Sequence, residues 1–170
     1  FNLWSEAERN AINIYAVTID NSKKKDERWY INTDITYSFD GTNATGSHGD
    51  ATARAHADTK WTQEEIDDNE APEGADTDTV KVEGLKTILI KTIKAQAEGE
   101  LNKTDWYITR KSEKNTAIPS AITTHRDAVR SKQASMETAI TNASDTPALE
   151  TLYTRNDSGV RPLGDLPILE

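Results

Sequence analysis

The segment from Asn102 to Ser144 decides the fold of the C-terminal half and reads NKTDWYITRKSEKNTAIPSAITTHRDAVRSKQASMETAITNAS. Thr104 and Asp105 predict a helix start, because a threonine can cap the first turn and a carboxylate there interacts favourably with the helix dipole. Large apolar side chains follow at once in a chain that has few of them. We therefore expect Trp106 to anchor the core.

This predicted short helix supplies three candidates for packing or interface contacts, namely Trp106, Tyr107 and Arg110. We expect Arg110 to form an ion pair, and Glu113 one turn further on is its candidate partner. Residues 115–119 then interrupt the helix, and Pro119 suits the first turn of a new one.

The new helix is predicted to run for about 24 residues, or about 36 Å. Its apolar side chains recur every seven residues and form one stripe, which consists of Ile122, Val129, Met136 and Ala143 and is widened by Ala139 and Ile140. The stripe can pack on an earlier helix of the same chain as a helical hairpin. It can also pack against another subunit, and the sequence leaves both arrangements open.

An earlier amphipathic helix is predicted from about Val80 to Leu101. Apolar side chains at spacings of three and four define its buried face, which comprises Val82, Leu85, Ile88, Leu89 and Ile93. Gly84 and Gly99 are poor helix residues, so we expect them to mark fraying ends.

An acidic stretch precedes this helix. Thr62 is expected to cap a helix of one or two turns, with Glu65 completing a capping box. Eight carboxylates and no basic residue lie between Thr62 and Thr79. The stretch lacks the glycine and the bidentate glutamate of a calcium-binding loop, so we interpret residues 61–79 as a solvated linker.

The N-terminal part is predicted to be rich in β-structure. Ser5 and Glu8 form a capping box before a short helix. Aromatic and β-branched residues predict strands at 15–19, 28–31 and 35–39, Asp40-Gly41 predicts a turn, and 51–57 is a possible edge strand.

These elements predict an α+β fold with a small antiparallel β-rich N-terminal part. We expect a short helix plus a β-rich domain over 1–60, the acidic linker over 61–79, a helical hairpin over 80–154 and an extended arm over 155–170.

Composition excludes several classes of function. The net charge of −9 argues against a nucleic-acid partner, which would require a clustered basic face. The absence of cysteine excludes a disulfide framework and a thiolate metal site. No apolar run approaches the about 20 residues of a membrane span, and we expect neither a membrane segment nor a signal peptide. Phe1 at the first position leaves the true start open.

The residues give no sign of catalysis. The three histidines, His48, His56 and His125, are the candidates for proton transfer near neutral pH, and each is interpreted as a surface or interface residue. His48 and His56 would lie more than about 20 Å apart on an extended ribbon, too far to share a metal. No nucleophile elbow or phosphate loop occurs. We predict no catalytic, cofactor-binding or metal-binding residue, no cofactor and no small-molecule substrate.

One sequence pattern begins with Thr104 to Glu113 and continues with Ala117-Ile118-Pro119 and with Arg126 to Arg130. This pattern resembles a recurring module of tailed bacteriophages. The pattern is similar to the C-terminal helical region of tail-fibre-assembly-like proteins and of tail or baseplate-associated proteins. The residues from Ser5 to Tyr15 and from Arg161 to Gly164 resemble the same proteins more loosely.

The resemblance implies a non-enzymatic structural protein of the phage virion, in the tail, baseplate or fibre-attachment region, made in the host cytoplasm. Its implied partners are other phage structural proteins and copies of itself. One alternative is a tail fibre assembly chaperone that leaves before maturation. Another is a receptor- or glycan-binding module that uses the aromatic rings of Trp29, Tyr30, Tyr37 and Trp61 as stacking platforms.

Overall fold

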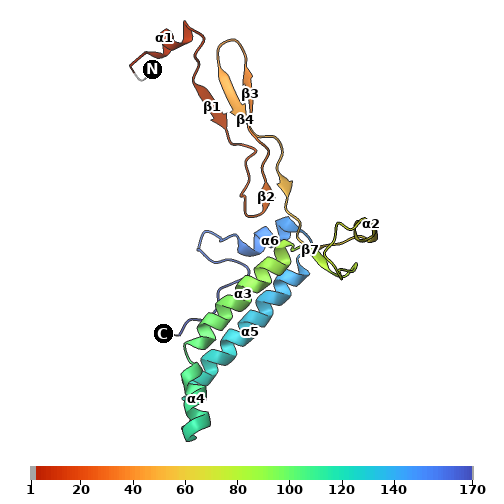
Figure 1. Cartoon of the computed structure of the whole chain (residues 1–170). Coiled ribbons are helices and arrows are strands. Elements are labelled where there is room, and N and C mark those ends of the chain that lie inside the picture. The colour runs from red at the N-terminus through yellow and green to blue at the C-terminus, as the bar shows by residue number, and fades with distance from the viewer. Residues whose placement is uncertain (1–2, 170) are drawn as a thin grey trace. The chain divides into compact units, whose positions relative to one another are not determined.

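Residues 3–169 are described in the computed structural model, and they divide into two units between Arg54 and Ala55. Strands dominate the first unit and helices the second, so the predicted α+β class is confirmed (Figure 1). The division lies six residues before the expected domain boundary at 60. Phe1, Asn2 and Glu170 lie outside the described residues.

The first unit contains one short helix and five strands: α1 (Glu6–Asn10), β1 (Val17–Asp20), β2 (Tyr30–Ile31), β3 (Thr36–Phe39), β4 (Ala44–Ser47) and β5 (Thr52–Ala53). The capping box predicted for α1 is confirmed. The Ser5 hydroxyl accepts a hydrogen bond from the Glu8 amide at 3.3 Å, and the Glu8 carboxylate accepts one from the Ser5 amide at 2.7 Å.

The main sheet has the strand order β1-β4-β3. The predicted Asp40-Gly41 turn joins β3 to β4, and the Asp40 carboxylate accepts the amide hydrogens of Thr42 and Asn43 at 2.8 and 2.7 Å. The expectation of purely antiparallel pairing is wrong for β1, which runs parallel to β4. The long connection from β1 to β4 allows this parallel pairing, which a tight hairpin could not make. The possible strand over 51–57 is reduced to β5, which pairs with β2.

The second unit contains two short strands and five helices: β6 (Thr59–Lys60), α2 (Gln63–Asp67), β7 (Val80–Val82), α3 (Leu85–Asn102), α4 (Asp105–Lys114), α5 (Ser120–Asn142) and α6 (Thr146–Tyr153). The predicted helix start at Val80 is wrong, because residues 80–82 pair with β6 as a strand. Val82 consequently lies outside the buried stripe and is 59% exposed. Ile88 lies within α3 but beside the buried stripe, and it is 46% exposed.

The start of α3 is fixed by residues from before the acidic stretch. The amides of Leu85 and Lys86 donate to the carbonyl oxygens of Ala55 and His56, both at 3.0 Å. Asp58 completes the contact and is described with Gly84 below. These bonds satisfy helix amides that otherwise lack partners within the first turn.

Gly84 is the N-cap of α3 and is buried, which corrects the expectation of a fraying end. A side-chain carbon at this position would lie 2.3 Å from the backbone of Ala57, so only glycine fits. The Asp58 carboxylate accepts the Gly84 amide at 2.7 Å and the Thr87 hydroxyl at 2.9 Å. Both hydrogen bonds, that from the Gly84 amide first, lower the pKa of Asp58 below its ordinary value. Gly99 lies in the last turn of α3, three residues before its end.

The core of the second unit is a helical hairpin in which α3 and α5 pack along each other (Figure 1). From α3 it buries Leu85, Leu89, Ile93 and Ala97, and from α5 it buries Ile122, Val129, Met136 and Ile140. The predicted seven-residue stripe is therefore covered within the chain. This outcome decides for the hairpin over packing of that stripe against another subunit.

The C-terminal arm has no helix or strand in its described residues, 155–169, as expected. It is anchored rather than free, because Leu163 is 3% exposed. The Leu163 amide donates to the Leu152 carbonyl at 3.0 Å, and Lys132 donates to the Leu163 carbonyl at 2.9 Å.

Candidate interaction surface at the end of the helical hairpin

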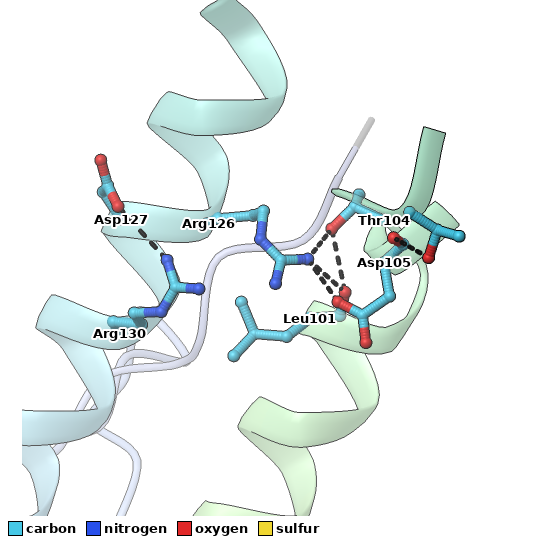
Figure 2. Close-up of polar contacts among 7 residues, drawn as sticks. Leu101, Thr104, Asp105, Arg126, Asp127 and Arg130 are labelled. Atoms are coloured by element: carbon cyan, nitrogen blue, oxygen red, sulfur yellow. Dashed lines mark hydrogen bonds and ion pairs between the residues drawn. The ribbon is translucent and has the colours of Figure 1, made fainter. Parts of the chain in front are cut away.

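A buried arginine joins the three helices that meet at one end of the hairpin. Figure 2 shows Arg126 reaching from α5 to the junction of α3 and α4. Its Nη1 donates to the Leu101 carbonyl at 2.7 Å, to the Thr104 hydroxyl at 2.6 Å and to the Asp105 carboxylate at 2.8 Å. Leu101 lies in the last turn of α3, where carbonyl groups have no partner within the helix. The arginine therefore ties the end of α3 and the start of α4 to α5.

Thr104 occupies the predicted N-cap position of α4, but its hydroxyl is used differently from the prediction. It makes no capping bond to an amide of α4. Instead the hydroxyl donates to the Leu101 carbonyl at 2.9 Å and accepts from Arg126, and the residue is completely buried. The residue thus serves the junction between two helices rather than the first turn of one.

Trp106 is not a core anchor, which corrects the expectation from the sequence. Its side chain is 52% exposed, and no residue of α4 is buried. The buried apolar residues of the hairpin come from α3 and α5, while α4 continues beyond the end of α3 (Figure 1). The large side chains of α4 are consequently left at the surface.

The rings of α4 form an ordered cluster with Arg110. The ring centroids of Trp106 and Tyr107 are 3.8 Å apart, and the Arg110 guanidinium lies 4.7 Å from the first and 5.2 Å from the second. The expected ion pair of Arg110 with Glu113 is not formed within residues 3–169. Stacking on the rings holds the guanidinium instead, and its Nε is buried without a hydrogen-bond partner in this part of the chain.

We refer to the surface of α4 formed by Trp106, Tyr107, Ile108, Arg110, Lys111 and Lys114 as the α4 tip; within it Tyr107 and Arg110 are half-buried. Ile108 is 43% exposed. Lys111 and Lys114 are exposed, and neither is in an ion pair with another described residue. The tip therefore combines aromatic, aliphatic and cationic groups on one short helix.

The acidic stretch contains the predicted short helix and several side-chain contacts. The Thr62–Glu65 capping box of α2 is confirmed. Lys81 pairs with Glu65 and lies 4.5 Å from the Trp61 ring centroid, and the pKa of Glu65 is lowered first by Lys81 and then by the Thr62 amide. Further along, the Thr79 hydroxyl and the Asp78 amide lower the pKa of Asp76.

Most carboxylates of this stretch lack a cation. Lys60 pairs with Asp78, which raises the pKa of Lys60, and Lys81 pairs with Glu65. Six others have no ion pair among the described residues: Glu64, Asp67, Asp68, Glu70, Glu73 and Asp76.

The three histidines lie apart in the chain, and His56 is half-buried. His48 contacts the Thr33 carbonyl through Nδ1 at 2.7 Å in the first unit. His125 is buried in the hairpin, which corrects its assignment to a surface or interface. Residues 3–169 contain no group of three or more side chains suited to hold a metal ion.

An open cavity of about 420 Å³ lies between α6 and the arm, and its two arginines, Arg155 and Arg161, both contact Asp165.

The aromatic residues proposed as stacking platforms are mostly covered. Trp29 and Tyr30 are 3% and 6% exposed, and the cationic groups of Arg28 and Lys25 lie 4.7 and 4.4 Å from their ring centroids. Only Tyr37, at 68% exposure, presents an open ring among the four. The receptor-binding alternative thus loses most of its proposed surface.

Comparisons with protein-family models, with curated proteins and with solved structures give no match for this chain. None of the described helices is both long and apolar enough to span a membrane.

Proposed function

We propose that this chain is a non-enzymatic structural protein of a tailed-bacteriophage virion, in the tail, baseplate or fibre-attachment region. It acts by packing against other virion proteins and against copies of itself. The observation that carries the proposal is the large amount of apolar surface that the folded chain leaves exposed.

The exposed surface exceeds what a chain of this size requires. The accessible area is 11688 Å² for 18.9 kDa. Two separate compact units of these lengths would expose about 9,900 Å² in total. Burial in an assembly would account for the excess.

The sheet of the first unit has one apolar face and one polar face. Its pairing places Val17, Ala44 and Phe39 in one row, and Ile19, Gly46 and Tyr37 in the next row on the same face. The opposite face is formed by Thr18, Asp20, Thr36, Ser38, Thr45 and Ser47.

This alternation is typical of a sheet whose apolar face packs against other residues and whose polar face is exposed to water. Nevertheless the apolar face is open: Val17, Ile19, Tyr37 and Phe39 are 46%, 40%, 68% and 50% exposed. Exposed patches of this kind mark protein–protein contacts on soluble proteins.

The phage-like pattern contributes a second line of support. Its residues Thr104, Asp105 and Arg126 are the ones that lock the helical junction, so the pattern coincides with a packing device. A structural role in the virion needs such a rigid module and requires no reacting groups.

Quantitative mass spectrometry of purified particles tests the proposal. The phage that encodes the chain would be purified by density gradient, and its tails separated from its capsids. We expect the chain in the tail fraction at a fixed copy number relative to other tail proteins. Its absence from mature particles, with a soluble complex with a fibre protein in infected cells, would establish the assembly-chaperone alternative instead.

A further inference from the structure

The α4 tip is a surface that the fold of a single chain leaves largely uncovered. The Arg126 contacts fix the junction from which α4 begins, and Arg110 stacks on both rings of Trp106 and Tyr107. Tryptophan, tyrosine and arginine are the residues most enriched at the energetic centres of protein interfaces. The free ammonium groups of Lys111 and Lys114 add positive charge beside them.

The chain contains a surface of opposite charge. The stretch from Thr62 to Thr79 carries eight carboxylates and no cation, so the rest of the chain has a net charge of only −1 out of −9. It is held in place by the α2 capping box, by the Lys81–Glu65 pair and by turns such as that from Pro72 to Ala75. We refer to residues 62–79 as the acidic segment.

One molecule cannot bring these two surfaces together. The acidic segment lies between β6 and β7, directly before α3, whereas the α4 tip follows the end of α3. The 18 residues of α3 separate them by about 27 Å along the helix axis. Figure 1 accordingly shows α2 and β7 at one end of α3 and α4 at the other.

From this arrangement we infer that the α4 tip binds the acidic segment of a second copy of the chain. The carboxylates that lack a cation in one molecule face the lysines and the ring-stacked arginine of the next. Two such contacts can form reciprocally in an antiparallel dimer, or repeated head-to-tail contacts close into a ring or continue as a filament. The inference rests on the part of the proposed function that concerns contacts between copies of the chain, and it names the surfaces that make this contact.

Paired charge reversals in the full-length chain test the contact. One variant, Lys111→Glu with Lys114→Glu, makes the tip acidic. The other, Asp67→Lys with Asp68→Lys, makes part of the acidic segment basic at the C-terminal end of α2, where cations are tolerated. Sedimentation velocity over a concentration series would measure self-association of each variant and of their equal mixture.

We expect each variant alone to associate at least tenfold more weakly than the wild type. The mixture regains association, because the acidic tip of one variant meets the basic segment of the other. Raising the salt from about 0.1 M to about 1 M, which shortens the screening length from about 10 to about 3 Å, weakens wild-type association. Trp106→Ala weakens it as well.

Two controls keep the test decisive. Lys23→Glu with Lys24→Glu makes the same change in net charge elsewhere on the chain and leaves association unchanged. The second control, Lys111→Gln with Lys114→Gln, removes the positive charge of the tip without adding carboxylates near the end of α4. Circular dichroism checks that each variant is folded.

A wild-type chain that stays monomeric overturns the inference, as does a mixture that fails to regain association. Either result leaves the particle composition untouched, so it refutes the contact between the α4 tip and the acidic segment but not the presence of the chain in a virion.

Discussion

Replacing Arg126 with methionine should destabilise the helical unit far more than the same change at Arg130. The two arginines lie one turn apart on α5 and both contact a carboxylate (Figure 2). They differ in burial, because the Arg126 side chain is 10% exposed and the Arg130 side chain 53%. Methionine keeps most of the aliphatic packing and removes the charge in each case.

The expected magnitude follows from the three acceptors of Arg126. Hydrogen bonds to charged groups contribute about 1.5–3 kcal/mol each. The sum must be reduced, since all three acceptors share one nitrogen that carries two protons. The Leu101 carbonyl also keeps its bonds from Thr104, and the Asp105 carboxylate is 54% exposed and regains water. We therefore expect a loss of about 2–3 kcal/mol in the free energy of unfolding.

Urea denaturation followed by far-ultraviolet circular dichroism measures this loss, because the long helices belong to the second unit. Arg130→Met should change the unfolding free energy by about 0.5 kcal/mol or less, as is typical of exposed ion pairs. Arg126→Lys should fall between the two, since one ammonium cannot reproduce the planar geometry of a guanidinium. Equal stabilities of the two methionine variants would refute the assigned role of Arg126.

Three further predictions concern the helical unit. Gly84→Ala should destabilise it by about 1–3 kcal/mol, because the new methyl group clashes with the backbone of Ala57. Gly99→Ala should stabilise it by up to about 1 kcal/mol, because nothing lies within 4 Å of the new methyl group. Thermal unfolding checks the pair, since the melting temperature should fall for the first variant and rise for the second. Ile140→Ala, at a fully buried site, should cost about 2–5 kcal/mol, while Ile88→Ala, at a 46% exposed site, should cost less than about 1 kcal/mol in urea unfolding. Asp58 has a lowered pKa in the fold, so its stabilising contribution is present above the unfolded pKa of 3.8 and is lost as the pH falls through the folded pKa. The Asp58→Asn variant should therefore lose less stability than the wild type when the pH falls from about 5 to about 2. A variant with the same pH dependence of stability as the wild type would contradict this role.

The sequence predicts the local elements of this fold well. The capping boxes at Ser5 and Thr62 form as expected, because a cap depends on residues three positions apart. The seven-residue stripe from Ile122 to Met136 is buried, because helical periodicity fixes which side chains share a face. The turn at Asp40-Gly41 likewise depends on adjacent residues.

Features that depend on distant contacts were not predictable in the same way. Val80 to Val82 have helical spacing yet form a strand, because β6 pairs with them. Gly84 reads as a helix breaker, and only the approach of Ala57 explains it. Trp106 has the size of a core residue, but the space between α3 and α5 is already filled by other side chains.

Only part of the candidate interaction surface can be predicted from the sequence. Trp106, Tyr107 and Arg110 were identified from the sequence and do lie together on one helix. The role of Arg126 was missed, although it belongs to the phage-like pattern, because its acceptors lie more than 20 positions earlier in the chain.

The proposed function requires this chain to be a permanent part of a virion. Counting its copies in purified tails by mass spectrometry, against a tail protein of known copy number, tests that claim directly. We predict a constant ratio that is set by the symmetry of the tail and is retained after washing in high salt. A chain that is present in infected cells but missing from the purified tails would contradict it.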